Sequence, residues 1–198
     1  MTLSAVLAEK TDYTPEQYLA LDIDAEFRSE YRDGKIVPMT GGTTEHNKIA
    51  GNFYAYLHFL LRKRGEEIYF GDVRLWIPEY RQYTYPDVMV VADAPIYHGQ
   101  GNTTVTNPSL ILEVLSRSTQ DYDRGTKFTY YRSIPEMREY ILVDQYQCFV
   151  EHFFKEPQGR WVLREYKRLE DTLCLESLGL SIELGELYGG VAIAPHEE

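Results

Sequence analysis

Two apolar runs without helical spacing predict the central strands of this protein. Residues 109–115 read Ser-Leu-Ile-Leu-Glu-Val-Leu, and residues 87–92 read Asp-Val-Met-Val-Val-Ala. Short continuous apolar runs are typical of strands that are buried on both faces of a sheet. A lone carboxylate in such a run is unfavourable, because taking its charge out of water costs several kcal/mol. We therefore expect Glu113 to be protonated, paired with a cation or bound to a metal ion.

Apolar residues at helical spacing predict the helices. Between Ile49 and Leu61 they recur every three or four positions, which predicts a long helix that begins at residue 43 or 44 and runs to 64. A short helix is expected over 14–24, where a threonine that can act as N-cap precedes a proline. A further helix is expected over 119–133, because a capping pattern precedes it and a proline follows it.

Turn residues and alternating patterns place the other strands. Asp33-Gly34, between the two alternating halves of residues 27–39, is a strong hairpin signal. Residues 93–108 are rich in Gly, Pro and polar side chains, which predicts a loop. Strands are also expected at 67–71, 73–77, 139–144, 147–154 and 160–166, with a strand or turn region at 172–183.

The order of these elements predicts the fold class. Strand 109–115, helix 119–133 and strand 139–144 form a βαβ unit, which requires parallel strands and a right-handed crossover. We therefore expect an α+β, or mixed α/β, domain with one central sheet, helices on both faces and a C-terminal antiparallel extension. The chain of 198 residues fits one domain at about 100–200 residues each. We place its limits at 14–190, after a loose leader (1–13) and before a frayed tail (191–198).

The composition narrows the classes of function. The net charge is −11, from 20 basic and 31 acidic residues, which counts against a general DNA-coating role because nucleic-acid binders usually carry a basic surface. Cys148 and Cys174 are far apart, which argues against a zinc ribbon or a disulfide framework and fits a reducing compartment. No stretch resembles a signal peptide or a membrane span, so we expect a cytoplasmic protein without a membrane partner.

The candidate catalytic residues are Asp87, Glu113 and Lys127. If the strands that carry the two acids are neighbours, both carboxylates can share one Mg²⁺ or Mn²⁺, since these ions prefer carboxylate, carbonyl and water ligands. Such an ion would polarise a scissile phosphate and acidify a bound water. Lys127 would bring a positive charge to the phosphate or orient the attacking water.

Several ordered motifs resemble one family. They are Tyr85-Pro86-Asp87, Glu113-Val114-Leu115-Ser116-x-Ser118-Thr119, Asp123-x-x-x-Lys127-x-x-x-Tyr131 and Glu139-Tyr140-x-Leu142-Val143-Asp144, preceded by Glu30-Tyr31-x-Asp33-Gly34-Lys35-Ile36 and His46. Together they are similar to the Uma-two family of restriction endonucleases, within the PD-(D/E)XK nuclease superfamily. The resemblance covers residues 14–188, nearly the whole chain.

The resemblance implies a restriction-endonuclease-like fold and a Mg²⁺-dependent endonuclease that acts on nucleic acid, most readily DNA. Asp87 and Glu113 would be the two acids of the motif, and the backbone carbonyl of Val114 a further metal ligand. The motif lysine normally follows the second acid by two residues, where this chain has Leu115. Lys127 matches the place of a lysine displaced onto the following helix. Auxiliary roles would fall to Glu30, His46 and Asp123.

Each of these residues also has a plainer interpretation. Glu113 could pair with a buried Arg or Lys, and Asp87 could be an ordinary residue at the start of its strand. Asp123 and Lys127, four positions apart, could form a helix-surface pair worth about 0.2–0.5 kcal/mol. Glu30 could be a solvated charge of the hairpin and His46 a capping or surface residue.

Two other functions are weighed against the nuclease. A catalytically silent nuclease-fold protein that serves as a binding or assembly module is favoured by the acidic charge and by the missing lysine after Glu113. A sugar hydrolase with paired carboxylates is a third class, without specific support. The nuclease predicts a basic cleft, for which the sequence offers Arg74, Arg117, Arg124 and Lys127. It also suggests a homodimer, since duplex cleavage on both strands suits a symmetric pair.

Overall fold

The protein is described from a computed structural model, which describes residues 12–23, 25–39 and 41–193. Most of the loose leader predicted for 1–13 lies outside these residues, as does the end of the tail predicted for 191–198. Tyr13 is buried, and its backbone N–H donates to the carbonyl of Gly34 at 3.0 Å. In the described part of the chain, no helix combines the length and the apolar character needed to cross a membrane.

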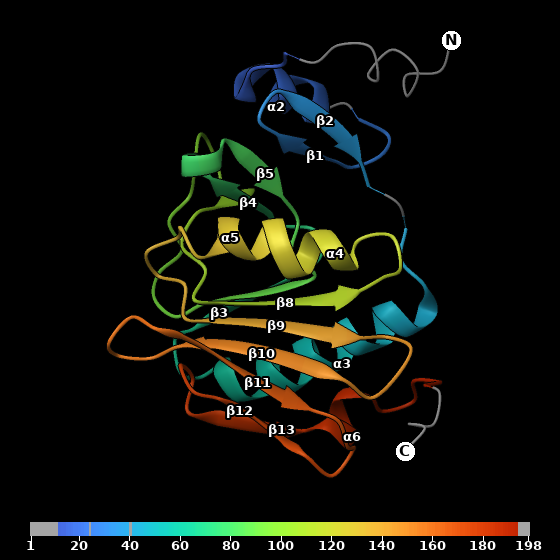
Figure 1. Ribbon diagram of the computed structural model, residues 1–198. Helices are drawn as coiled ribbons and strands as arrows, with labels where there is room; N and C mark the ends of the chain where they lie inside the picture. Colours follow the sequence, from blue (N-terminus) through green and yellow to red (C-terminus); the bar gives the residue numbers. More distant parts are fainter. Residues whose placement is uncertain (1–11, 24, 40, 194–198) are drawn as a thin grey trace.

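A six-stranded mixed sheet forms the centre of the molecule, in the order β11-β10-β9-β8-β6-β3 (Figure 1). The strand predicted over 109–115 is buried at every residue from Leu110 to Leu115, as expected from its apolar run. The strands are β3 (Glu67–Phe70), β6 (Val88–Val91), β8 (Leu110–Leu115), β9 (Glu139–Asp144), β10 (Val150–Lys155) and β11 (Trp161–Tyr166).

The predicted βαβ unit is present. Strands β8 and β9 are parallel, from the pair Leu110 and Glu139 to the pair Leu115 and Asp144. The helical crossover differs from the regular helix expected over 119–133, because a π-helical turn interrupts it. It consists of α4 (Gln120–Tyr122), the π-helical turn η2 (Asp123–Lys127) and α5 (Phe128–Tyr131).

Helices cover both faces of this sheet, as predicted (Figure 1). On one face α3 (Thr44–Leu61) packs its buried residues, such as Phe53 and Leu57, against Val88 and Leu112. On the other face Tyr131 of α5 packs against Ile111 and Tyr140. Because side chains alternate along a strand, Leu112 and Glu113 point to opposite faces, and Glu113 points to the face of α5.

A second sheet was not predicted, and the expectation of one sheet was wrong in this respect. Its order is β2-β1-β5-β4-β7, and it lies with α2 (Pro15–Ile23) beside the central sheet (Figure 1). Strands of two or three residues give no readable period, and the shortest lies in the segment predicted as a loop. The strands are β1 (Ser29–Arg32), β2 (Lys35–Pro38), β4 (Arg74–Ile77), β5 (Gln82–Thr84), which follows the 3₁₀ turn η1 (Pro78–Tyr80), and β7 (Thr104–Val105).

The hairpin and the C-terminal extension agree with the sequence. At the tip of β1 and β2, Asp33 and Gly34 both have positive φ, at 40° and 95°, as a tight hairpin turn requires. The C-terminal region forms the antiparallel pair β12 (Thr172–Leu175) and β13 (Leu180–Glu183), followed by α6 (Leu184–Leu187). Beyond it, Val191 and Ile193 pack against the core.

Candidate active site

Asp87 directly precedes β6, and Glu113 lies within the adjacent strand β8. Strands β6 and β8 are antiparallel, and Val88 pairs with Leu112. The next position of this register places Asp87 opposite Glu113, and directly opposed residues share one face of a sheet. Asp87 Oδ2 also accepts a hydrogen bond from the backbone N–H of Val114 at 2.7 Å. The two acids therefore come from neighbouring positions of the sheet, and a metal ion shared between them stays a prediction.

Lys127 is held against Glu113 in the interior. Its Nζ lies 2.7 Å from Glu113 Oε1, and the hydroxyl of Tyr131 donates to the same oxygen at 2.6 Å. Lys127 Nζ also lies 3.4 Å from Asp123 Oδ1 and 3.9 Å from Glu30 Oε1. Lys127 and Asp123 are buried, so the interpretation of this pair as a helix-surface contact was wrong.

The π-helical turn gives this crossover its local geometry. Residues Asp123–Lys127 form the turn, between two short stretches of α-helix. A π-helical turn inserts an extra residue into a helix and shifts which side chains face the sheet, and such turns are frequent at functional sites. The Asp123 carbonyl accepts the hydroxyl of Tyr140 at 3.1 Å, which ties the turn to β9.

Glu30 is a buried anion rather than a solvated hairpin charge. Its Oε1 accepts from the hydroxyl of Thr84, and its Oε2 accepts from Arg32 at 2.6 and 2.9 Å. Burial alone would raise the pKa of Glu30, but the charges of Lys127 and Arg32 outweigh it and lower the pKa below its ordinary value. Glu30 therefore stays ionised and contributes negative charge beside Lys127.

The pKa values of Glu113 and Lys127 are both raised. Burial raises the pKa of Glu113 above its ordinary value, Lys127 opposes this rise, and Asp87 and Asp123 add to it. Burial would lower the pKa of Lys127, yet the surrounding carboxylates raise it well above its ordinary value. Burial and Glu113 likewise raise the pKa of Tyr131. Lys127 and Tyr131 therefore both keep the protons that they donate to Glu113 at neutral pH.

His46 brings the first turn of α3 to Asp87. Its Nε2 lies 2.9 Å from Asp87 Oδ1. Thr43 caps the helix, because its side chain accepts the N–H of His46 at 3.1 Å. Burial lowers the pKa of His46, but the hydrogen bond and the charge of Asp87 raise it above its ordinary value. His46 is therefore neither the cap nor a free surface residue.

Comparisons with known proteins identify the family of this chain. The family model of Uma2, described as "Putative restriction endonuclease", matches residues 15–185. The chain belongs to the Uma2 family. Two relatives of this Uma2 chain come from Synechocystis sp.: the uncharacterized protein sll1609 is 41% identical over 81% of this chain and 90% of its own, and slr1290 is 34% identical over 90% and 93%.

A solved structure shares the fold of this Uma2 chain. A "putative nuclease belonging to DUF820" from Anabaena variabilis superposes with a TM-score of 0.74 and covers 91% of this chain and 99% of its own. The sequence identity is 18%, so this likeness concerns the fold. It confirms the predicted restriction-endonuclease-like architecture, with mixed sheets flanked by helices.

The donor atoms of this Uma2 site fit a hard cation. Among the described residues, no three His, Cys, Asp or Glu side chains form a ready cage for a metal ion. Mg²⁺ does not need one, because it is commonly held by one or two carboxylates and several waters. Both hydrogen bonds to Glu113 end on Oε1, so Oε2 remains for such an ion. The carbonyl of Val114 as a further ligand stays a prediction.

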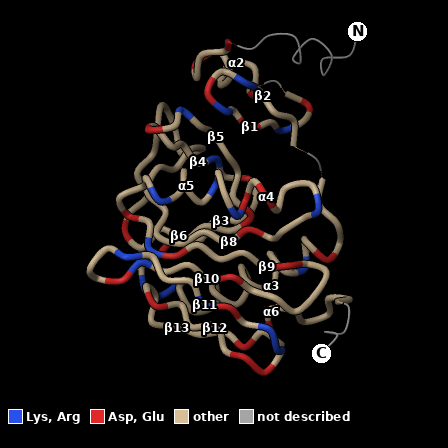
Figure 2. The backbone as a smooth tube through the Cα atoms, in the orientation of Figure 1, with Lys and Arg blue, Asp and Glu red and all other residues tan. Residues whose placement is uncertain are grey.

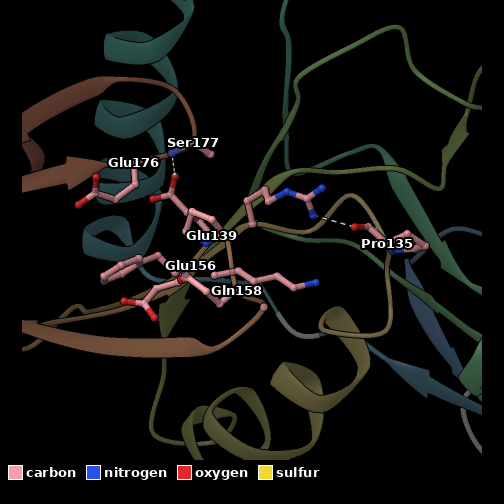
Figure 3. Close-up of a pocket in the computed structure, with 11 residues that line it drawn as sticks. Pro135, Glu139, Glu156, Gln158, Glu176 and Ser177 are labelled. Atoms are coloured by element: carbon pink, nitrogen blue, oxygen red, sulfur yellow. Dashed lines mark hydrogen bonds between the residues drawn. The ribbon is translucent and has the colours of Figure 1, made fainter.

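Two cavities differ in their distance from the candidate site. One of about 280 Å³ reaches Asp87 and His46, with Gly42, Phe70 and Asp72 among its lining residues. A larger one, of about 880 Å³, lies around Glu139, the first residue of β9 (Figure 3). Glu113 pairs with Leu142, further along the same strand. There Glu139 is bonded to His152 and to the N–H of Ser177, and none of the predicted site residues lines the cavity. The smaller cavity is therefore the approach to the candidate site.

Most of the basic side chains expected to form a cleft are paired with carboxylates. Arg74 pairs with Asp22 at 3.0 Å and Arg124 with Glu151 at 2.6 Å. Arg117, in contrast, has no carboxylate partner among the described residues. The expectation of four available cations was therefore wrong for Arg74, Arg124 and Lys127, which are already paired with carboxylates.

Two residues that shape the site were not predicted from the sequence. Tyr131 is part of the family pattern, but no role was predicted for it. Its spacing was a usable signal, because Asp123, Lys127 and Tyr131 recur every four positions and so share one side of a helix. Thr84, which donates to Glu30, gave no signal, because its strand is three residues long and belongs to the unpredicted sheet.

Proposed function

We propose that this protein is a Mg²⁺-dependent endonuclease that hydrolyses phosphodiester bonds of nucleic acid, most readily DNA. The observation that carries the proposal is the convergence of three groups: Asp87 Oδ2 accepts the N–H of Val114, the residue after Glu113, at 2.7 Å, and Lys127 Nζ lies 2.7 Å from Glu113 Oε1. Membership of a family of restriction endonucleases and a nuclease-like fold support the same class of chemistry.

In this proposal Asp87, Glu113 and the carbonyl of Val114 hold the cation. When bound, Mg²⁺ or Mn²⁺ supplies polarisation of the phosphate and acidity of a bound water. His46 fixes the orientation of Asp87 through the bond to Oδ1. Lys127 stays protonated and offers its ammonium to the negative charge that develops on the phosphate. We extend the proposal to a homodimer, because cutting both strands of a duplex suits two-fold symmetry.

The test combines metal binding with cleavage. Mn²⁺ is titrated calorimetrically into the wild type, Asp87→Asn, Glu113→Gln and the control Asp121→Asn, an exposed acid of the same crossover. Cleavage of labelled DNA is then followed with Mg²⁺ and with EDTA. We expect binding and cleavage in the wild type and the control, and neither in the two site variants. Circular dichroism verifies the fold of each variant.

A second function is a catalytically silent binding or assembly module. It is favoured by the matched cations, since Arg74 and Arg124 already face carboxylates. It predicts no Mg²⁺-dependent cleavage by the wild type and no loss of function in Asp87→Asn. Folded wild type that binds no Mn²⁺, with or without DNA, would favour the module over the nuclease.

A further inference from the structure

Few basic side chains of this protein are available to a phosphate. Lys and Arg are interspersed with Asp and Glu along the chain (Figure 2), and most of them face a carboxylate. Within the described residues, the basic side chains without a carboxylate partner are Lys35, Arg62, Lys63, Arg117, Arg132, Arg138 and Lys155.

Arg117 is the member of this set that follows the strand of Glu113. It comes two residues after the end of β8, and Tyr146 comes two residues after the end of β9. Because β8 and β9 are parallel, their carboxyl ends lie side by side, and so do the two residues that follow them. Glu113 is in the C-terminal half of β8, near the same end. Ligands of such sheets bind outside the carboxyl ends of the parallel strands.

Four of the other available cations lie away from Asp87 and Glu113. Arg138 and Lys155 line the cavity around Glu139, at the far end of β9. Arg62 and Lys63 follow the C-terminal end of α3, whereas His46 is in its first turn. A helix of 18 residues is about 27 Å long, so these two residues are far from Asp87.

Arg117 and Tyr146 form an exposed pair. The guanidinium carbon of Arg117 lies 5.0 Å from the centre of the Tyr146 ring, and Tyr146 is 40% exposed. A partly exposed aromatic ring, with an arginine over it that has no carboxylate partner among the described residues, has the two components of a single-strand binding site: a ring that can stack on a base and a charge for its phosphate.

The backbone beneath this pair is fixed to the candidate active site. Buried Gln145 donates its Nε2 to the carbonyl of Leu115 at 2.7 Å, and its Oε1 accepts the hydroxyl of Thr43, the N-cap of α3. The N–H of Tyr146 donates to Asp144 Oδ1 at 2.7 Å. These bonds join the ends of β8 and β9 to the helix that carries His46, so Arg117 and Tyr146 keep their place relative to Asp87.

We propose that Arg117 and Tyr146 bind an unpaired stretch of DNA next to the scissile phosphate, so that the substrate is single-stranded at that point. This inference rests on the proposed function. Arg117 contacts a phosphate and Tyr146 stacks on the face of a base. In a duplex that face is covered by the neighbouring base pair. The net charge of −11 favours this substrate over long duplex DNA, because duplex binding depends on many phosphate contacts.

The test measures binding separately from cleavage. Fluorescence anisotropy follows a labelled single-stranded DNA of about 12 nucleotides, within the usual size of single-strand sites, the duplex of the same sequence, and the corresponding RNA. Ca²⁺ replaces Mg²⁺ so that the oligonucleotide stays intact. The variants are Arg117→Ala, Tyr146→Ala and Tyr146→Phe. Arg62→Ala is the matched control, because Arg62 lies over the exposed ring of Phe59 at 4.8 Å, at the other end of α3.

We expect the wild type to bind the single strand more tightly than the duplex. Arg117→Ala and Tyr146→Ala should each weaken single-strand binding by about tenfold, while Tyr146→Phe and Arg62→Ala bind as the wild type does. The plot of log affinity against log salt should have a shallow slope, about −0.7 for each phosphate contact, and Arg117→Ala should reduce it by about that amount.

Each contrary result has a defined meaning. Unchanged single-strand binding by Arg117→Ala and Tyr146→Ala, tighter binding of the duplex, or tighter binding of the RNA overturns this inference. If the wild type nevertheless cleaves DNA with Mg²⁺ and Asp87→Asn does not, the proposed function stands. A wild type that neither binds nor cleaves any of the three nucleic acids overturns both.

Discussion

Lys127 reaches Glu113 from the helical crossover rather than from the strand. Its Nζ lies 2.7 Å from Glu113 Oε1, and both side chains are buried. Leu115, two residues after Glu113 on the same face, packs into the apolar cluster there. The strand thus carries an apolar residue, Leu115, where the superfamily pattern has its lysine. The lysine that contacts Glu113 comes from the π-helical turn instead.

Replacement of Lys127 should destabilise the protein strongly. Lys127→Met leaves Glu113, Glu30 and Asp123 close together without their shared cation, and breaking a buried ion pair costs about 3–5 kcal/mol. Urea unfolding followed by circular dichroism measures the change. Lys63→Met is the control, because Lys63 is exposed and has no carboxylate partner among the described residues. Equal unfolding free energies for the two variants would contradict the buried network.

Removal of the Tyr131 hydroxyl tests how far this group orients the Glu113 carboxyl group, while Lys127 stays in place. Tyr131→Phe deletes the bond of 2.6 Å to Glu113 Oε1 and should cost about 1.5–3 kcal/mol of stability, the range for hydrogen bonds to charged groups. We also expect weaker Mn²⁺ binding, because Glu113 loses a group that fixes its orientation. Tyr130→Phe, on the same helix, is the control for both measurements. A Tyr131→Phe protein as stable as Tyr130→Phe would show that this bond contributes nothing.

The acids and their strands were predictable, whereas the network around them was not. The apolar runs sufficed to place Glu113 in a buried strand and Asp87 at the start of another, because a continuous apolar run is local in the sequence. That these two strands are neighbours was only a condition of the metal-site hypothesis, and the structure supplies it. The contact of Glu30 with Thr84 depends on β5, a strand of three residues that no sequence pattern indicated, and it joins the predicted hairpin to β4 in a sheet that was not predicted. The π-helical turn also escaped prediction, since the sequence from Asp123 to Lys127 has ordinary helical spacing.

The pH dependence of stability should report the charge of Glu30. Its pKa is lowered in the folded protein, against an ordinary value of 4.5, although burial alone would raise it. The stabilisation from ionised Glu30 is therefore fully present above pH 4.5 and is lost as the pH falls through the lowered pKa. The measurement compares urea unfolding of the wild type and Glu30→Gln between neutral pH and about pH 3. A stability difference that stays constant over this range would mean that Glu30 does not ionise in its buried position.

His46 should act on metal binding through Asp87. The His46→Ala substitution removes the contact of 2.9 Å to Asp87 Oδ1 but leaves both proposed acidic ligands in place. Loss of a residue that orients a metal ligand typically lowers metal affinity or activity by about 10–100-fold. We therefore expect a Mn²⁺ affinity at least tenfold weaker by calorimetry, with the helix still capped by Thr43.

The control for this prediction is His58→Ala, on the same helix. His58 is exposed and stacks on Tyr54, with ring centres 5.4 Å apart, in the last turn of α3. Its loss should leave Mn²⁺ affinity unchanged, because it lies about 18 Å along the helix from His46 at a rise of 1.5 Å per residue. Equal losses of affinity in both variants would indicate a general effect on α3, and an unchanged affinity in His46→Ala would show that Asp87 binds the cation without this histidine.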